Sequence, residues 1–197
     1  MVISESGLDF IFDDSYDVVK FDDTDFYRKY FSAMPEGKGV DILGRSDDVI
    51  FLIEIKNCTG DEHNNTWRTG VDNSLLNKVK GDQDIDGRES LDIEMAKKTA
   101  MTFDCIYGSW TVSKRVTDEL SSFWKDMTST KIQNDKKTIM VMLFLEGDFN
   151  TRTRTKKAMM SRIQDSIKKK LRWLNCKISV VDTKTYNNRY FEVKKRF

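Results

Sequence analysis

The pattern of apolar and polar positions predicts a β-hairpin over residues 39–57. Two segments, GVDILGR and VIFLIEIKN, are rich in β-branched residues, and the polar triplet Ser46-Asp47-Asp48 separates them. Short apolar runs bounded by turn-forming residues are typical of paired strands. We therefore expect two adjacent antiparallel strands joined by a tight turn.

The second strand of this hairpin carries two charges on one face. Side chains alternate across a strand, so the face with Leu52 also carries Glu54 and Lys56. Asp41 lies near the start of the first strand, and its carboxylate can approach Glu54 if the register allows. Charged groups are rarely buried in an apolar strand without a partner or a metal. A compensating ion is therefore expected here.

Other segments have the periods of further helices and strands. Helices are predicted at 24–34, at 89–108 with an apolar stripe and Gly108 as its end, and at 156–174. Strands are predicted at 8–12, 138–147 and 176–184, and residues 110–128 have a weaker helical pattern. This order predicts an α/β fold, a three-layer αβα sandwich around a mixed central sheet. One domain spans residues 1–197, with 57–90 as a long polar loop or insertion.

Charge is divided unevenly along the chain although the net charge is +1. Residues 151–197 hold 15 Lys and Arg against three acidic residues, whereas residues 1–150 hold 18 against 29. Such asymmetry indicates a polyanionic partner, because neutralised phosphates release condensed counterions. The basic C-terminal helix and strand include Lys168, Lys169 and Arg172, outside an apolar stripe formed by Met160, Ile163, Ile167, Leu171 and Leu174. Nucleic-acid contact and a plain solvated face both explain these cations.

The scarce residue types exclude several classes of site. His63 is the only histidine, which argues against an imidazole-based zinc site or a Ser-His-Asp triad. The three cysteines are widely separated, as expected for reduced thiols in an intracellular protein. No apolar run is long enough to span a bilayer, so we expect a soluble, cytoplasmic protein without membrane contact. Catalysis, if any, must use carboxylates and lysines.

Asp41 followed by Glu54-Ile55-Lys56 resembles the D-(x)n-(D/E)-x-K signature of the PD-(D/E)xK nuclease superfamily, whose fold is restriction-endonuclease-like. In that family the signature occupies the second and third strands of an αβββαβ core, and the resemblance covers about residues 20–145. Val40 stands where the family usually has proline. A second likeness is Lys20 to Asp23, where family members often supply an additional acidic residue.

The resemblance implies a metal-dependent nuclease, with Asp41, Glu54 and the Ile55 carbonyl binding Mg²⁺, for which Mn²⁺ can substitute. Lys56 would orient the attacking water and stabilise developing negative charge. Hard divalent cations prefer oxygen ligands and supply the charge stabilisation that phosphodiester hydrolysis needs. Asp22 is a candidate extra acidic ligand. On the following helix, Lys97 and Lys98 are candidate phosphate contacts.

The expected function is therefore hydrolysis of phosphodiester bonds in nucleic acid, with DNA favoured. One alternative is a catalytically inactive nuclease-like domain that binds nucleic acid. Another is a protein-binding domain whose basic helix docks on an acidic partner. In the polar loop, Trp67 and Arg68 can contact a base or anchor the loop on the domain. A homodimer is compatible with each of these functions.

Overall fold

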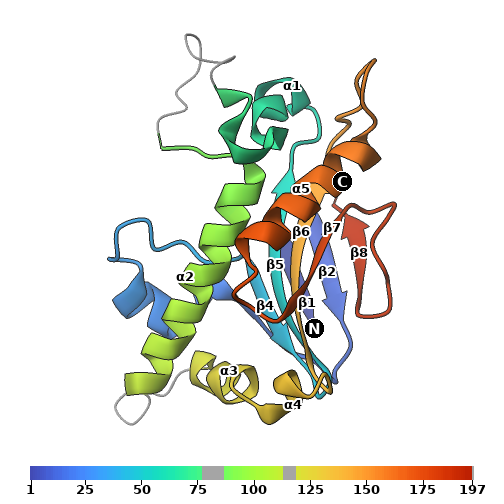
Figure 1. The fold of residues 1–197 in the computed structure, drawn as a ribbon. Coiled ribbons are helices and arrows are strands. Elements are labelled where there is room, and N and C mark those ends of the chain that lie inside the picture. The colour runs from blue at the N-terminus through green and yellow to red at the C-terminus, as the bar shows by residue number, and fades with distance from the viewer. Residues whose placement is uncertain (77–86, 113–118, 197) are drawn as a thin grey trace.

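The structure is a computed structural model that describes residues 1–76, 87–112 and 119–196 (Figure 1). It is a mixed α/β fold whose centre is a five-stranded sheet with the order β3-β4-β5-β6-β7. These strands are β3 (Asp17–Lys20), β4 (Ile42–Arg45), β5 (Val49–Asn57), β6 (Thr138–Glu146) and β7 (Cys176–Val181). Strands β3, β4 and β5 pair antiparallel, whereas β5, β6 and β7 pair parallel.

The predicted hairpin is confirmed, and so is the division of its side chains. Strands β4 and β5 pair antiparallel with Ile42 opposite Ile53, and residues 46–48 form the turn. Leu52 faces one hydrophobic core, whereas Phe51 and Ile55 face the other. Strand β5 is therefore buried on both faces, as is usual for a strand at the centre of a sheet.

Helices cover one face of the five-stranded sheet. They are α2 (Leu91–Val112), α3 (Leu120–Met127), α4 (Thr130–Gln133) and α5 (Lys156–Lys170), and Figure 1 shows α2 and α5 crossing this face. The predicted stripe of α5 is confirmed, because Met160, Ile163 and Ile167 are buried in the core on this side. Such a one-sided apolar stripe is what packs a helix onto a sheet.

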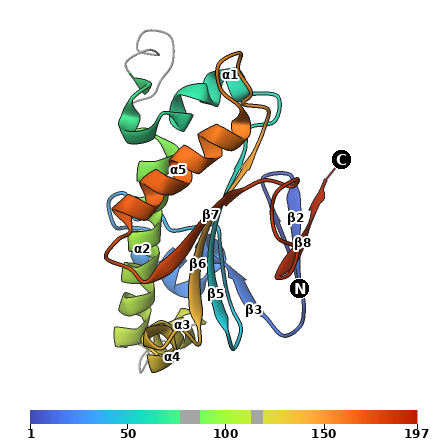
Figure 2. The same ribbon diagram turned by 45° about the vertical axis from the view of Figure 1, so that its right-hand side comes forward.

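A second sheet covers the opposite face, where the predicted αβα sandwich has a further helical layer. Strands β1 (Val2–Glu5), β2 (Leu8–Phe12) and β8 (Phe191–Lys195) form an antiparallel sheet with the order β1-β2-β8. Figure 2 shows this small sheet beside the five-stranded one. Aromatic rings fill the space between them, with Phe10 5.2 Å from Phe144 and Phe51 6.1 Å from Phe191 between ring centroids. The prediction of helices on both faces is therefore wrong for the described residues, because the two chain ends pair with each other and cover this face.

The first two predicted helices differ from their predicted limits. Helix α2 continues past Gly108 to Val112, and its buried face includes Thr99 and Thr102 in place of the predicted apolar stripe. Each of these hydroxyls donates to the carbonyl four residues earlier, which allows a polar side chain to be buried. The helix predicted at 24–34 is shorter, since the π-helical turn η2 (Tyr27–Phe31) ends it before Pro35.

The polar stretch 57–90 is only partly described, and residues 77–86 lie outside the described part. Its first half folds into short helices near the N-terminal end of α2: α1 (Glu62–Asn65), η3 (Thr66–Thr69) and η4 (Val71–Asn73). A further 3₁₀ turn, η1 (Phe21–Asp23), follows β3. None of the helices in the described ranges has the length and apolarity needed to cross a membrane.

Candidate active site

The Asp41 side chain is fixed where the start of β4 lies beside the end of β5. Its backbone N–H donates to Ile53 at 3.0 Å, which continues the hairpin ladder one residue beyond β4. Its Oδ2 then accepts the backbone N–H of Ile55 at 2.7 Å. Asp41 therefore takes the place of a further strand residue, with its carboxylate against the end of β5.

Glu54 precedes Ile55 on β5 and is almost fully buried, with 1% of its side chain exposed. Its Oε1 is 2.8 Å from the ammonium of Lys56 and 2.6 Å from that of Lys98. Its Oε2 has no hydrogen-bond partner among the described residues. A buried carboxylate oxygen without a partner is costly, so this atom has the capacity for a further ligand.

Helix α2 and the 3₁₀ helix η3 complete the arrangement. Lys98 on α2 is 3.8 Å from Asp41 as well as bonded to Glu54, and Glu94 one turn earlier is 2.8 Å from the ammonium of Lys56. Arg68 on η3 forms an ion pair with the other oxygen of Glu94. Carboxylates and cations thus alternate in one network, which we name the charged cluster: Asp41, Lys98, Glu54, Lys56, Glu94 and Arg68.

Burial and charge change the protonation of the charged cluster. Burial, together with the neighbouring Glu54, raises the pKa of Asp41 to about 7. Burial opposes the charged form of Lys56, but Glu54 and Glu94 outweigh it and raise the pKa of this lysine above its ordinary value. Burial likewise opposes ionisation of Glu94, yet Lys56 and Arg68 hold the pKa of this carboxyl below its usual range. Asp41 therefore changes its protonation near neutral pH.

A pocket opens beside the charged cluster. It has a volume of about 430 Å³, and Arg68, Glu94 and Lys98 belong to both the cluster and the pocket wall. Five cations and three carboxylates line it. Because the described residues Lys38 and Arg88 form no ion pair with another described residue, the wall has cations free for an anion. We name this cavity the basic pocket.

The donor set fits a hard divalent cation. Asp41 and Glu54 provide carboxylate oxygens, and one of these, Glu54 Oε2, lacks a partner in the described part of the chain. The N–H and C=O of a strand residue point to the same side, so the Ile55 carbonyl lies on the side where its N–H meets Asp41. No third acidic, His or Cys side chain joins the two carboxylates within residues 1–76, 87–112 and 119–196. The remaining ligands of such a cation would be water or substrate oxygens.

Comparison with known protein families matches residues 24–195 to DUF6661, a family of unknown function. The chain belongs to this family. No curated protein and no solved structure matches it. The charged cluster lies wholly within the matched residues.

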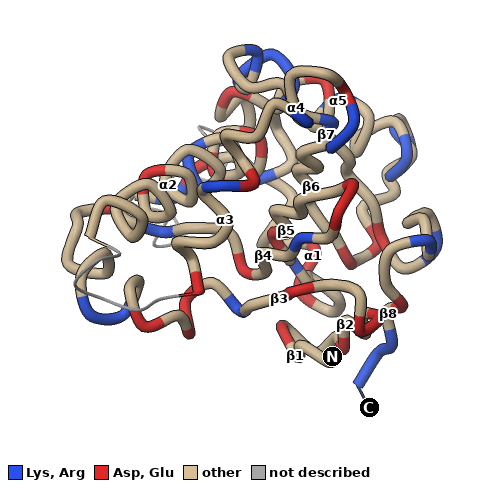
Figure 3. Tube along the Cα trace, turned by 90° about the horizontal axis from the view of Figure 1, so that it is seen from below, with Lys and Arg blue, Asp and Glu red and all other residues tan. Residues whose placement is uncertain are grey.

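The remaining predicted site residues of this DUF6661 chain lie outside the charged cluster. Asp22 is on η1 with an exposed side chain, and its carboxylate forms no ion pair with a described residue. Lys97 is exposed and pairs with Glu89 at 2.9 Å. Lys168, Lys169 and Arg172 are exposed at the C-terminal end of α5 and beyond it. Figure 3 shows basic residues along α5 and at the C-terminal end of β8. Their roles in binding nucleic acid stay predictions.

Sequence reasoning missed Glu94 and gave Lys98 a different place. Lys98 was predicted as a phosphate contact, and the structure places its ammonium on the carboxylates of Glu54 and Asp41. Glu94 had one usable signal, since it stands four residues before Lys98 and shares its face of α2. Of the loop pair, Trp67 is buried and anchors the loop, whereas Arg68 reaches the charged cluster.

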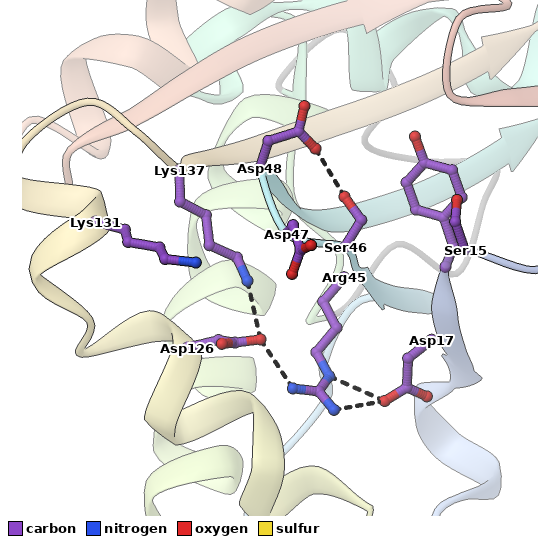
Figure 4. Close-up of a pocket in the computed structure, with 10 residues that line it drawn as sticks. Ser15, Asp17, Arg45, Ser46, Asp47, Asp48, Asp126, Lys131 and Lys137 are labelled. Atoms are coloured by element: carbon purple, nitrogen blue, oxygen red, sulfur yellow. Dashed lines mark hydrogen bonds and ion pairs between the residues drawn. The ribbon is translucent and has the colours of Figure 1, made fainter.

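A second group of charges lies at the opposite end of β4 (Figure 4). Arg45 is 2.9 Å from both Asp17 and Asp126, and the buried Lys137 is 3.0 Å from Asp126. These residues line a cavity of about 470 Å³. They connect β3, β4, α3 and the start of β6, and each of the four has an oppositely charged partner. We therefore expect this network to have a structural role in the chain.

Proposed function

We propose that the protein is a metal-dependent nuclease of the PD-(D/E)xK type that hydrolyses phosphodiester bonds, with DNA as the favoured substrate. The observation that carries the proposal is the position of Asp41 against Glu54. Two residues of the signature that are separated by a turn meet at the same end of one hairpin. A motif that occurred by chance in the sequence would not need to have these two residues close together in the fold.

The arrangement of the elements supports a restriction-endonuclease-like core. Asp41 directly precedes β4 and Glu54 lies in β5, the second and third strands of the five-stranded sheet in chain order. Helix α2 and strand β6 follow, as the αβββαβ order requires. The helical turn η2 stands between β3 and β4 where that order has its first helix before the strands. This departure changes the position of the first helix relative to the strands and leaves the hairpin unchanged.

Mg²⁺, or Mn²⁺ in its place, would be held by Asp41, Glu54 and the Ile55 carbonyl. When bound, such an ion supplies positive charge that stabilises the transition state and lowers the pKa of a bound water. Lys56 is held by Glu54 and Glu94, each at 2.8 Å. From this position its ammonium orients the attacking water and stabilises negative charge on the phosphate. Lys38 and Arg88 of the basic pocket, which have no ion-pair partner among the described residues, bind the substrate backbone.

Cleavage assays with Mg²⁺ or Mn²⁺ test the proposal on plasmid, linear duplex, single-stranded DNA and RNA. Asp41→Ala, Glu54→Ala and Lys56→Ala are each expected to lower metal-stimulated cleavage by roughly a hundredfold or more. Asp25→Asn serves as the control, because Asp25 is an exposed carboxylate that pairs with Lys29. If purified Glu54→Ala cleaves like the wild type, the proposal is wrong.

A second candidate function is nucleic-acid binding without hydrolysis. The observation that favours it is the double neutralisation of Glu54 by Lys56 and Lys98, which can hold the carboxylate without a metal. A protein of this kind would retain nucleic acid in a salt-sensitive manner and show no turnover in either metal. Turnover by the wild type that is lost in Glu54→Ala would reject this candidate.

A further inference from the structure

Lys98 is the cation closest to the two carboxylates proposed as metal ligands. Its ammonium is 2.6 Å from Glu54 Oε1 and 3.8 Å from Asp41 Oδ1. It therefore lies between the two groups that a divalent cation would have to share. A divalent cation bound by Asp41 and by the unpartnered Glu54 Oε2 would lie close to this ammonium, and the two positive charges would repel each other.

Lys56 and Lys98 differ in the partners that would hold them when a metal binds. Lys56 has a second partner outside the metal ligands, since Glu94 is 2.8 Å away. Lys98 has only Glu54 and Asp41 as ion-pair partners among the described residues. If one ammonium has to move when a metal binds, Lys56 remains held by Glu94, and Lys98 is the one released.

The structure also offers Lys98 a second position. Lys98 lines the basic pocket, and its four-carbon side chain can rotate there while its backbone stays in α2. The pocket has a volume of about 430 Å³ and contains Lys38 and Arg88, which are without an ion-pair partner in the described ranges. A third cation among them would favour a phosphate group of a nucleic-acid backbone.

We infer that Lys98 exchanges with the metal ion: its ammonium pairs with Asp41 and Glu54 when no metal is bound, and turns into the basic pocket to bind a substrate phosphate when the metal binds. The inference rests on the proposed function, because it needs the same two carboxylates to be metal ligands. It links metal binding to substrate binding through one side chain. The metal would thus create the phosphate site as well as the catalytic centre.

The test is the affinity for Mn²⁺ alone, measured by isothermal titration calorimetry without nucleic acid. Lys98→Met removes the competing charge and is expected to bind Mn²⁺ about tenfold more tightly than the wild type. Lys125→Met is the control, since this exposed lysine on α3 belongs neither to the charged cluster nor to the basic pocket. Its affinity is expected to stay within twofold of the wild type. Lys98→Gln, which can still donate a hydrogen bond to Glu54, covers the case in which Lys98→Met fails to fold.

Equal or weaker Mn²⁺ binding by the folded Lys98 variants would overturn the exchange while leaving the metal site in place, provided that Glu54→Gln weakens Mn²⁺ binding. Absence of Mn²⁺ binding by the wild type and by the Lys98 variants at millimolar metal would overturn the proposed metal site and the inference together.

The proposed binding of a substrate phosphate by Lys98 is tested by fluorescence anisotropy with a duplex oligonucleotide. The wild type and Lys98→Met, both of which keep Glu54, are compared with and without Mn²⁺. The gain in affinity on adding Mn²⁺ is expected to be on the order of tenfold smaller in Lys98→Met, and an undiminished gain would reject the proposed phosphate binding.

Discussion

The backbone N–H of Ile55 donates to the Asp41 carboxylate at 2.7 Å, so an aspartate that precedes one strand is bonded to the end of the next. This bond keeps Asp41 beside Glu54 without a metal. Their mutual repulsion, added to burial, raises the pKa of Asp41 to about 7. The contact that assembles the proposed site therefore makes the ionised form of Asp41 unfavourable in the folded protein.

The pH dependence of stability follows from this pKa. Asp41 ionises near pH 3.8 in the unfolded chain and near pH 7 in the folded protein, so between these values the folded state binds more protons. The free energy of unfolding therefore falls as pH rises from about 4 to 7, by on the order of 4 kcal/mol from this group. Asp41→Asn removes that fall.

Urea unfolding of both proteins at pH 5 and pH 8, in the presence of EDTA, measures the effect. The free energy of unfolding of Asp41→Asn minus that of the wild type is expected to be larger at pH 8 than at pH 5. Asp25→Asn, an exposed aspartate with a salt bridge to Lys29, is the control. The same stability difference at both pH values would show that Asp41 ionises normally.

Glu94 is expected to position Lys56 and Arg68 without touching the metal. Glu94→Gln keeps the shape of the side chain but removes the charge that holds both cations. Loss of a residue that orients catalytic groups typically costs 10–100-fold in activity. We expect a fall of that size in kcat with Mn²⁺ affinity changed by less than twofold.

Two comparisons make the Glu94 experiment specific. Glu192→Gln on the exposed side of β8 is the control for loss of a carboxylate. A loss of Mn²⁺ affinity in Glu94→Gln equal to its loss of activity would place Glu94 among the metal ligands. A full wild-type kcat would show that Lys56 is oriented without it.

The hairpin and its motif could be predicted from sequence because they depend on local rules. Alternation places Glu54 and Lys56 on one face, and the three-residue turn sets the register that carries Asp41 to Glu54. The second sheet could not be predicted, since β2 pairs with β8 from the other end of the chain. A pairing of that kind leaves no periodic signal within either segment.

Lys98 and Arg68 illustrate the same limit within the site. In sequence each looks like an exposed cation, and only the tertiary fold brings Lys98 of α2 to Glu54 and Arg68 of η3 to Glu94. Buried threonines on α2 also hid its true inner face, because hydroxyls bonded to the helix backbone count as polar in any sequence pattern.

The ion pairs at the far end of β4 are expected to contribute to stability and not to catalysis. Asp126→Ala leaves the buried Lys137 without a carboxylate and Arg45 with only Asp17. The expected loss is about 1.5–3 kcal/mol, as for hydrogen bonds to charged groups. Denaturant unfolding gives the loss, and cleavage at a temperature where the variant is folded is expected to equal that of the wild type. Loss of cleavage in the folded variant would contradict the structural role.

The last prediction concerns the basic end of α5, where Lys168, Lys169 and Arg172 are exposed. If these cations contact the nucleic-acid backbone, the charge-reversed triple variant, with Glu at each position, binds DNA more weakly and with a flatter salt dependence. The reason is that fewer counterions are released per complex. Mn²⁺ binding is expected to survive, since the charged cluster does not include these residues. Because backbone contacts position the substrate, KM is expected to rise more than kcat falls. Affinity measured between 50 and 200 mM salt, the range over which phosphate contacts change binding strongly, decides the matter. Binding and cleavage like the wild type at every salt concentration would instead identify this part of α5 as a solvated face whose other side packs on the sheet.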